Sequence, residues 1–251
     1  MADAISAYKE AFSSYRKNIV DYIIYSLIAG IIEAGLFAIL LVMLFVLGIV
    51  SAGGIVSISS TGNIFSFEAL GFGATTLVLL AGFLIFLLVQ GGIAGAYIKT
   101  IALLLSGQKQ SLGGFFSLLP HFAAKMLVIY LVIGIFVSIP TIAGFALAYF
   151  LGWGLIGAAV VILAVFLSLL VSVFFVYAMP IAVVDGRGAV DSVKISIVRV
   201  IRNPVAAMIY MVVSGILCLP MIIPVVNALY ASFVLMPITQ SALIVLCKHT
   251  H

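Results

Sequence analysis

Long apolar runs constrain this sequence more than any other feature. Six of them follow one another along the 251 residues, and each is continuously rich in Leu, Ile, Val and Ala. A helix needs about 20 apolar residues to cross a bilayer core, whereas a transmembrane strand needs about ten and alternates in polarity. The runs therefore predict transmembrane helices and exclude transmembrane strands. They occupy residues 19–49, 75–105, 122–146, 153–183, 204–222 and 225–247.

The composition supports the same class of protein. Hydrophobic residues make up 66% of the chain and charged residues only 7%, against about 25% charged residues in soluble domains. So few charges could not cover a folded domain in water, which excludes the soluble globular, disordered and disulfide-rich secreted classes. Because the spans use most of the length, we expect a single membrane domain over residues 1–251.

The eleven Lys and Arg residues predict the orientation of the spans. They lie at the two termini or in and beside the second-to-third and fourth-to-fifth connections, and the other connections carry none. The positive-inside rule then predicts a multi-pass protein of the cell membrane with both termini in the cytoplasm. The isoelectric point of about 9.1 therefore indicates contact with membrane lipids that carry anionic headgroups, and not with nucleic acid.

The sequence contains an internal repeat. Residues 4–32 match residues 189–217 at a constant offset of 185, and a weaker third copy begins at Ser111. Each copy starts with a short amphipathic helix and continues into a transmembrane hairpin. We therefore predict an all-α integral membrane protein of six transmembrane helices, arranged as three parallel repeats about a pseudo-threefold axis along the membrane normal. The repeats cover approximately residues 1–105, 108–183 and 186–247. The most informative matches pair Lys9 with Lys194, Asn18 with Asn203, Tyr25 with Tyr210 and Gly30 with Gly215.

The short helices that open the repeats carry apolar residues on one side and polar or cationic residues on the other. This pattern is typical of a helix that lies along the inner headgroup boundary with its apolar side in the acyl region. The alternative is a cytoplasmic collar that gates a pathway or recruits a partner. For the interfacial arrangement, we expect anionic-lipid contacts from Lys9, Arg16, Lys17, Lys194, Arg199 and Arg202.

Glu33 is an acidic residue deep inside a predicted span. It lies 14 residues beyond Ile19, about 21 Å along a helix that rises 1.5 Å per residue. An ionised carboxylate at that depth is costly, so the side chain must be protonated, hydrogen-bonded or exposed to a wet cavity. The open interpretations are a structural hydrogen bond, a ligand or proton site, and exposure at a tilted helix end. Candidate members of this intramembrane polar site are Glu33, Tyr149, Asn227, Gln90, Gln240 and Tyr25.

No arrangement of residues indicates catalysis. Gly152, Gly154 and Gly157 have the spacing of a dinucleotide-binding loop, but they lie at the turn of an apolar hairpin and not between a strand and a helix. His249 and His251 have no third metal ligand nearby in the sequence. Catalysis inside a membrane needs paired polar groups at one depth, and the sequence places none there. We therefore expect a non-enzymatic protein with no catalytic, cofactor-binding or metal-binding residues.

Small residues recur four apart at Gly91 and Gly95, and again at Gly154 and Ala158. This spacing lets two helices approach closely. Close packing within the chain is the favoured interpretation, and a homo-oligomer is the alternative.

Two connections carry a resemblance to a known family. Residues 91–93 (GGI) with residues 105–111 (LSGQKQS), and residues 184–196 (VDGRGAVDSVKIS), are similar to segments of the YciC-type inner-membrane proteins. The chain also resembles the membrane domain attached to some glycerophosphodiester phosphodiesterases. The resemblance covers nearly the whole chain and implies a bacterial or archaeal six-span protein. It implies no catalytic residues, and the phosphodiesterase domain found beside some relatives has no counterpart in this sequence.

The function predicted from the sequence is non-enzymatic, with a lipid or another apolar molecule bound between the repeats. A small-solute or ion channel or transporter, with its pathway along the pseudo-axis, is the first alternative. A packing subunit of a membrane complex, with an unidentified membrane partner, is the second. Polar residues are sparse in the spans, which favours lipid binding, because a pathway needs polar side chains at several depths.

Overall fold

The computed structural model describes residues 2–61, 67–222 and 230–249, and the side chains of residues 4–45, 76–220 and 230–248. Every regular element in these ranges is a helix, so the all-α class is confirmed. In chain order they are α1 (Ala2–Lys17), α2 (Ile19–Thr61), α3 (Phe67–Leu105), α4 (Leu112–Leu151), α5 (Leu155–Val173), α6 (Ala178–Val184), α7 (Ala189–Arg202), α8 (Pro204–Cys218), the 3₁₀ helix η1 (Leu219–Ile222), the π-helix η2 (Ala231–Leu235) and α10 (Met236–His249).

The described helices include those of a multi-pass membrane protein. Five helical segments in the described ranges are long and apolar enough to cross a bilayer, and the number is six if α7 and α8 are taken as one bent span. The apolar runs thus predicted helices that could cross a membrane, although several boundaries differ and the fifth run, 204–222, qualifies only when α8 is joined to α7. The third predicted span, residues 122–146, is part of the longer helix α4.

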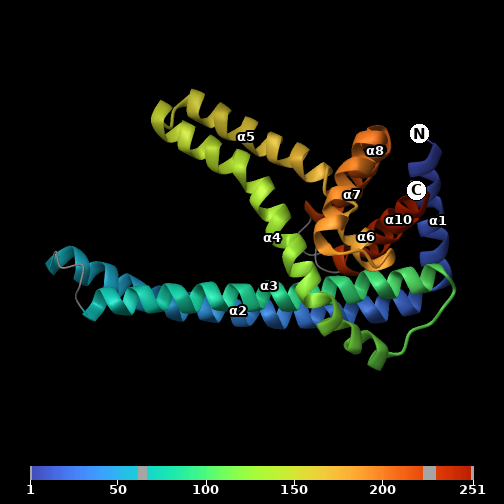
Figure 1. Ribbon diagram of the computed structural model, residues 1–251, viewed down its shortest axis with the longest axis horizontal. Helices are drawn as coiled ribbons and strands as arrows, with labels where there is room; N and C mark the ends of the chain where they lie inside the picture. Colours follow the sequence, from blue (N-terminus) through green and yellow to red (C-terminus); the bar gives the residue numbers. More distant parts are fainter. Residues whose placement is uncertain (1, 62–66, 223–229, 250–251) are drawn as a thin grey trace.

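Two long hairpins dominate the shape (Figure 1). Helices α2 and α3 pack along each other in the first hairpin, and α4 and α5 form the second. The hairpins diverge toward their tips, while α1, α6, α7, α8 and α10 gather at the other end of the molecule. This divergence differs from three parallel hairpins around a common axis, so the pseudo-threefold arrangement stays a prediction.

Glycines allow the two hairpins to cross closely. A Cβ atom at Gly92 would lie 2.7 Å from the carbonyl oxygen of Leu119, and one at Gly95 would lie 2.4 Å from Cβ of Phe122. Real Cβ atoms do not approach so closely, so α3 and α4 can meet only where α3 lacks side chains. The small residues near Gly91 therefore serve packing within the chain, as the sequence favoured.

Two of the three predicted short helices are separate from the spans that follow them. Asn18 divides α1 from α2, and Asn203 divides α7 from α8, where the helix axes bend by 100°. Pro204 is the first residue of α8, a position where its missing N–H costs nothing. The third predicted short helix begins as expected, with the backbone N–H of Gly114 donating to Oγ of Ser111, but it continues without a break into the span of α4.

Helix α1 packs against α10 through a face of alanines. Ala4, Ala7 and Ala11 recur at helical spacing and are at most 1% exposed. The bulky residues Ile5 and Phe12 of the predicted apolar stripe lie on another side and are about half exposed. Helix α1 therefore presents its alanines together with Tyr8 and Tyr15 to the protein, and Ile5 and Phe12 to its surroundings.

Candidate functional site

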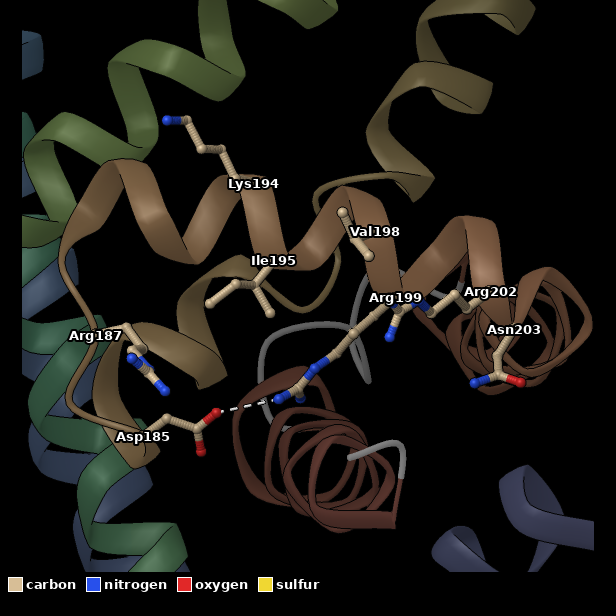
Figure 2. A pocket seen from close by; sticks show the side chains of 8 residues that line it. All are labelled: Asp185, Arg187, Lys194, Ile195, Val198, Arg199, Arg202 and Asn203. Atoms are coloured by element: carbon tan, nitrogen blue, oxygen red, sulfur yellow. Dashed lines mark hydrogen bonds and ion pairs between the residues drawn. The ribbon is translucent and has the colours of Figure 1, made fainter.

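A cavity of about 380 Å³ lies along α7 at the corner where α6, α7 and α8 meet. Two sharp turns of the chain shape this corner. Gly186 has a φ of 67°, which favours glycine, and it turns the chain from α6 into α7; the bend at Asn203 follows at the other end of α7. Figure 2 shows the lining side chains: Asp185, Arg187, Lys194, Ile195, Val198, Arg199, Arg202 and Asn203. We call this space the cationic cavity, because four of its lining residues are Lys or Arg and one is acidic.

Arg199 lies at the inner wall of the cationic cavity and joins three parts of the chain. Its Nη2 pairs with Oδ2 of Asp185 at 3.2 Å, and its Nη1 donates to the carbonyl oxygen of Cys247 at 2.9 Å. Nη1 also lies 2.7 Å from Sγ of Cys247. The carbonyl belongs to the last turn of α10, where carbonyl oxygens commonly accept hydrogen bonds from outside the helix. Arg199 therefore fixes α7 to the turn before it and to the end of α10.

This arrangement gives Arg199 a structural role that the sequence did not predict. We predicted contact with anionic lipid, but the residue is only 7% exposed and its guanidinium is held by Asp185 and Cys247. The physical reason is the position of Arg199 on the side of α7 that faces α10. From the sequence, Arg199 is grouped with the other predicted lipid-contact residues, because it lies on a basic amphipathic helix.

The other cationic residues of the cavity are exposed. Arg187, Lys194 and Arg202 form no ion pair with a described acidic side chain. In Figure 2, Arg187 lies beside Asp185, while Lys194 extends away from it. The wall of the cavity therefore contains one arginine whose charge is paired with a carboxylate, Arg199. The three cationic residues around it have no such ion pair with a described residue.

The predicted lipid-contact residues fall into two groups. Lys194, Arg199 and Arg202 line the cationic cavity. Lys9, Arg16 and Lys17 are exposed on α1 and do not line it.

Glu33 has a polar partner on the neighbouring helix. Nε2 of Gln90 donates to Oε1 of Glu33 at 3.1 Å, which joins α2 to α3. Glu33 also lines a small pocket of about 30 Å³, together with Ser26, Ala29, Gly30, Ala94, Tyr97, Ser232 and Met236.

The structure does not bring Tyr149, Tyr25 or Gln240 to this site. Tyr149 is 71% exposed near the end of α4. The hydroxyl of Tyr25 donates to the carbonyl oxygen of Gln110. Gln240 lines a different cavity of about 380 Å³ between α5, α8 and α10, and Asn227 lies outside the described residues. Of the six predicted residues, Glu33 and Gln90 alone are shown to be in contact.

Sequence reasoning missed Ser26, Tyr97 and Ser232 near Glu33. The helical spacing of the sequence could have identified two of them. Ser26 precedes Glu33 by seven residues, and Tyr97 follows Gln90 by seven, which is two helical turns in each case. Ser232 carries no such signal, because its place depends on how the third hairpin packs against α2.

Within the described ranges, no group of three or more His, Cys, Asp or Glu side chains could hold a metal ion. In comparisons with known proteins, no family model, no curated protein and no solved structure matches the chain.

Proposed function

We propose that this chain is a non-enzymatic membrane protein that binds an anionic phospholipid, with the headgroup phosphate in the cationic cavity. The observation that carries the proposal is the charge of that cavity. Arg187, Lys194, Arg199 and Arg202 line it against the single carboxylate of Asp185. Asp185 already compensates Arg199, which leaves three exposed cations for a ligand. Arginine guanidinium groups bind phosphate oxygens in a two-point geometry that suits a lipid headgroup.

Apolar residues next to the cavity support a lipid over a free anion. Val198 lines the cavity and is 45% exposed, and Ile201 on the same helix is 64% exposed. Val205 at the start of α8 is 53% exposed. A lipid whose phosphate occupies the cavity would have apolar helix surface within reach of its acyl chains.

The expected orientation agrees with this ligand. The positive-inside rule places the cationic cavity at the cytoplasmic leaflet, where anionic lipids create a negative surface potential. We also retain the three-repeat architecture and the YciC-type relationship as proposals. The repeats have support from the equivalent residues Asn18 and Asn203, each of which divides a short helix from a span.

Lipid retention by charge variants tests the proposal. A triple variant with Arg187→Gln, Lys194→Gln and Arg202→Gln removes the exposed cations of the cavity. The matched control, Lys9→Gln, Arg16→Gln and Lys17→Gln, removes the same charge from α1. Each cation near an anionic surface contributes about 1 kcal/mol, so the cavity variant should bind phosphatidylglycerol more weakly by roughly two orders of magnitude. Native mass spectrometry in mixed phosphatidylglycerol and phosphatidylcholine micelles measures the retained lipid. Equal losses in the two variants would mean that the whole cationic face attracts lipid and that the cavity is not the site.

A further inference from the structure

The pocket beside Glu33 is small, and half of its lining residues carry a side-chain oxygen. It lies between α2, α3, the π-helix η2 and the first residue of α10. Its volume of about 30 Å³ is close to the share of one water molecule in the liquid. This space suits a water molecule or an ion of similar size and is too small for an organic ligand.

Four of the lining residues carry a side-chain oxygen: Ser26, Glu33, Tyr97 and Ser232. Oγ of Ser26 and the hydroxyl of Tyr97 are 2.7 Å apart and share a hydrogen bond. A hydroxyl oxygen has two lone pairs, so each keeps acceptor capacity for a further partner. Gln90 donates to one oxygen of Glu33, and the carboxylate keeps further acceptor capacity.

The pocket contains a carboxylate without a compensating cationic side chain. Glu33 forms no ion pair with a described Lys or Arg. The titratable groups close to it are the phenols of Tyr97 and Tyr130, which are neutral when protonated. A charged carboxylate in an apolar segment needs a neutralising partner. Since the protein supplies none here, a bound cation can provide it.

We propose that Glu33, Ser26, Tyr97 and Ser232 bind one small monovalent cation of the size of sodium. Glu33 supplies the charge, and the three hydroxyls replace water from the hydration shell of the ion. A divalent ion such as calcium takes six to eight oxygen ligands and usually more than one carboxylate. A proton needs one oxygen only, and it would not require three further oxygens around a defined space.

Gly30 keeps this space open. A Cβ atom at residue 30 would lie 3.8 Å from Oγ of Ser232, an ordinary contact distance. The chain can therefore accept alanine at this position, but its methyl group would occupy the pocket. Gly35 lies on the same helix, and a Cβ atom there meets nothing within 4 Å. The Gly30→Ala and Gly35→Ala variants thus form a matched pair in which only the first removes the proposed site.

Thermal unfolding of the purified full chain in detergent tests the proposal with sodium ions as the probe. Sodium chloride replaces choline chloride at constant ionic strength and pH 8. Sodium at about 100 times its Kd should raise the Tm of the wild type and of Gly35→Ala by roughly 5 to 10 °C. Gly30→Ala and Glu33→Gln should lose this rise. A rise that persists in Gly30→Ala would overturn the proposal, as would a Tm that responds to pH and not to sodium, the result expected of a proton site.

A direct count of bound ions covers the case in which Glu33→Gln does not fold. Equilibrium dialysis with radioactive sodium should give one ion per wild-type chain and none per Gly30→Ala chain. The triple variant of the cationic cavity should still bind one ion, since its substitutions lie outside this pocket. Sodium binding without lipid selectivity would support the cation site alone. Lipid selectivity without sodium binding would support the proposed function alone. Absence of bound sodium in the folded wild type would refute the cation site.

Discussion

Asp185 and Arg199 form an ion pair that is largely withdrawn from solvent. Oδ2 of Asp185 lies 3.2 Å from Nη2 of Arg199, and the two side chains are 18% and 9% exposed. The pair spans the turn from α6 into α7 and holds in place the wall of the cationic cavity. A buried pair of this kind contributes little relative to apolar residues, but the loss of one partner leaves a buried charge uncompensated.

The first prediction compares the loss of one partner of this ion pair with the loss of both. Asp185→Asn should lower the free energy of unfolding by about 3 kcal/mol, because Arg199 keeps its charge and loses its carboxylate. The double variant Asp185→Asn with Arg199→Met should recover most of the loss, since neither charge remains. Equilibrium unfolding in mixed detergent micelles measures both. A double variant less stable than Asp185→Asn would show that the bond from Arg199 to the carbonyl of Cys247 matters more than the ion pair.

The second prediction concerns the crossing of α3 and α4. Gly92→Ala should destabilise the protein by about 1 to 3 kcal/mol, because its Cβ atom would collide with the backbone at Leu119. Gly134→Ala on α4 serves as the control, because a Cβ atom there meets nothing within 4 Å. Alanine is the better helix former by about 1 kcal/mol, so the control should be neutral or slightly stabilised. Similar Tm values for the two variants would contradict the close crossing.

The third prediction concerns the contact between α1 and α8. The hydroxyl of Tyr8 lies 2.7 Å from Oγ of Ser214 and donates to the carbonyl oxygen of Tyr210 at 3.2 Å. Burial raises the pKa of Tyr8 to about 12, against 10.0 for an unperturbed tyrosine. The folded state therefore binds this proton more tightly than the unfolded state. The resulting stability is fully present below pH 10 and is lost as the pH rises toward 12.

Tyr8→Phe isolates this contribution from the other ionisable groups. At pH 8 the variant should be less stable by about 0.5 to 1.5 kcal/mol, the usual net contribution of a hydrogen bond. Thermal unfolding between pH 8 and pH 12 should show the difference from the wild type shrinking as the wild-type tyrosine ionises. A difference that is constant across this range would mean that Tyr8 does not lose its proton there.

The fourth prediction concerns orientation. Cysteine at residue 154 should react with an impermeant thiol reagent added to intact cells, and cysteine at residue 108 should not. Both substitutions are made without the native thiols, with Cys218→Ser and Cys247→Ala. Gly154 has open space for a side chain, and Gln108 is exposed, so neither substitution disturbs packing. Labelling of both positions from outside the cell would contradict the predicted topology.

The sequence predicted the helical spans because run length and hydropathy are local properties. It did not predict the alanine face of α1, since alanine is neutral in a pattern that separates bulky apolar residues from polar ones. The packing role of these alanines depends on the position of α10, which lies against Ala4, Ala7 and Ala11. The uninterrupted helix α4 was missed for a related reason, because an amphipathic segment and an apolar segment can belong to the same helix.

The candidate sites were predictable in part. Glu33 is conspicuous because a carboxylate is costly inside an apolar run. Its contact with Gln90 follows from the pairing of α2 with α3, which run length alone does not determine. Asp185 was not singled out in the sequence, because its ion pair with Arg199 depends on which side of α7 faces inward.

The packing of α1 on α10 has a consequence for biosynthesis. Helix α1 leaves the ribosome before α10, the helix that covers its alanine face and begins more than 200 residues later. At ordinary elongation rates of about 5 to 20 residues per second, the interval is roughly 10 to 45 s. During that time the small-residue face of α1 has no native partner, and chaperones or neighbouring nascent chains can reach it. The alanine face of α1 is therefore covered only after α10 has been made.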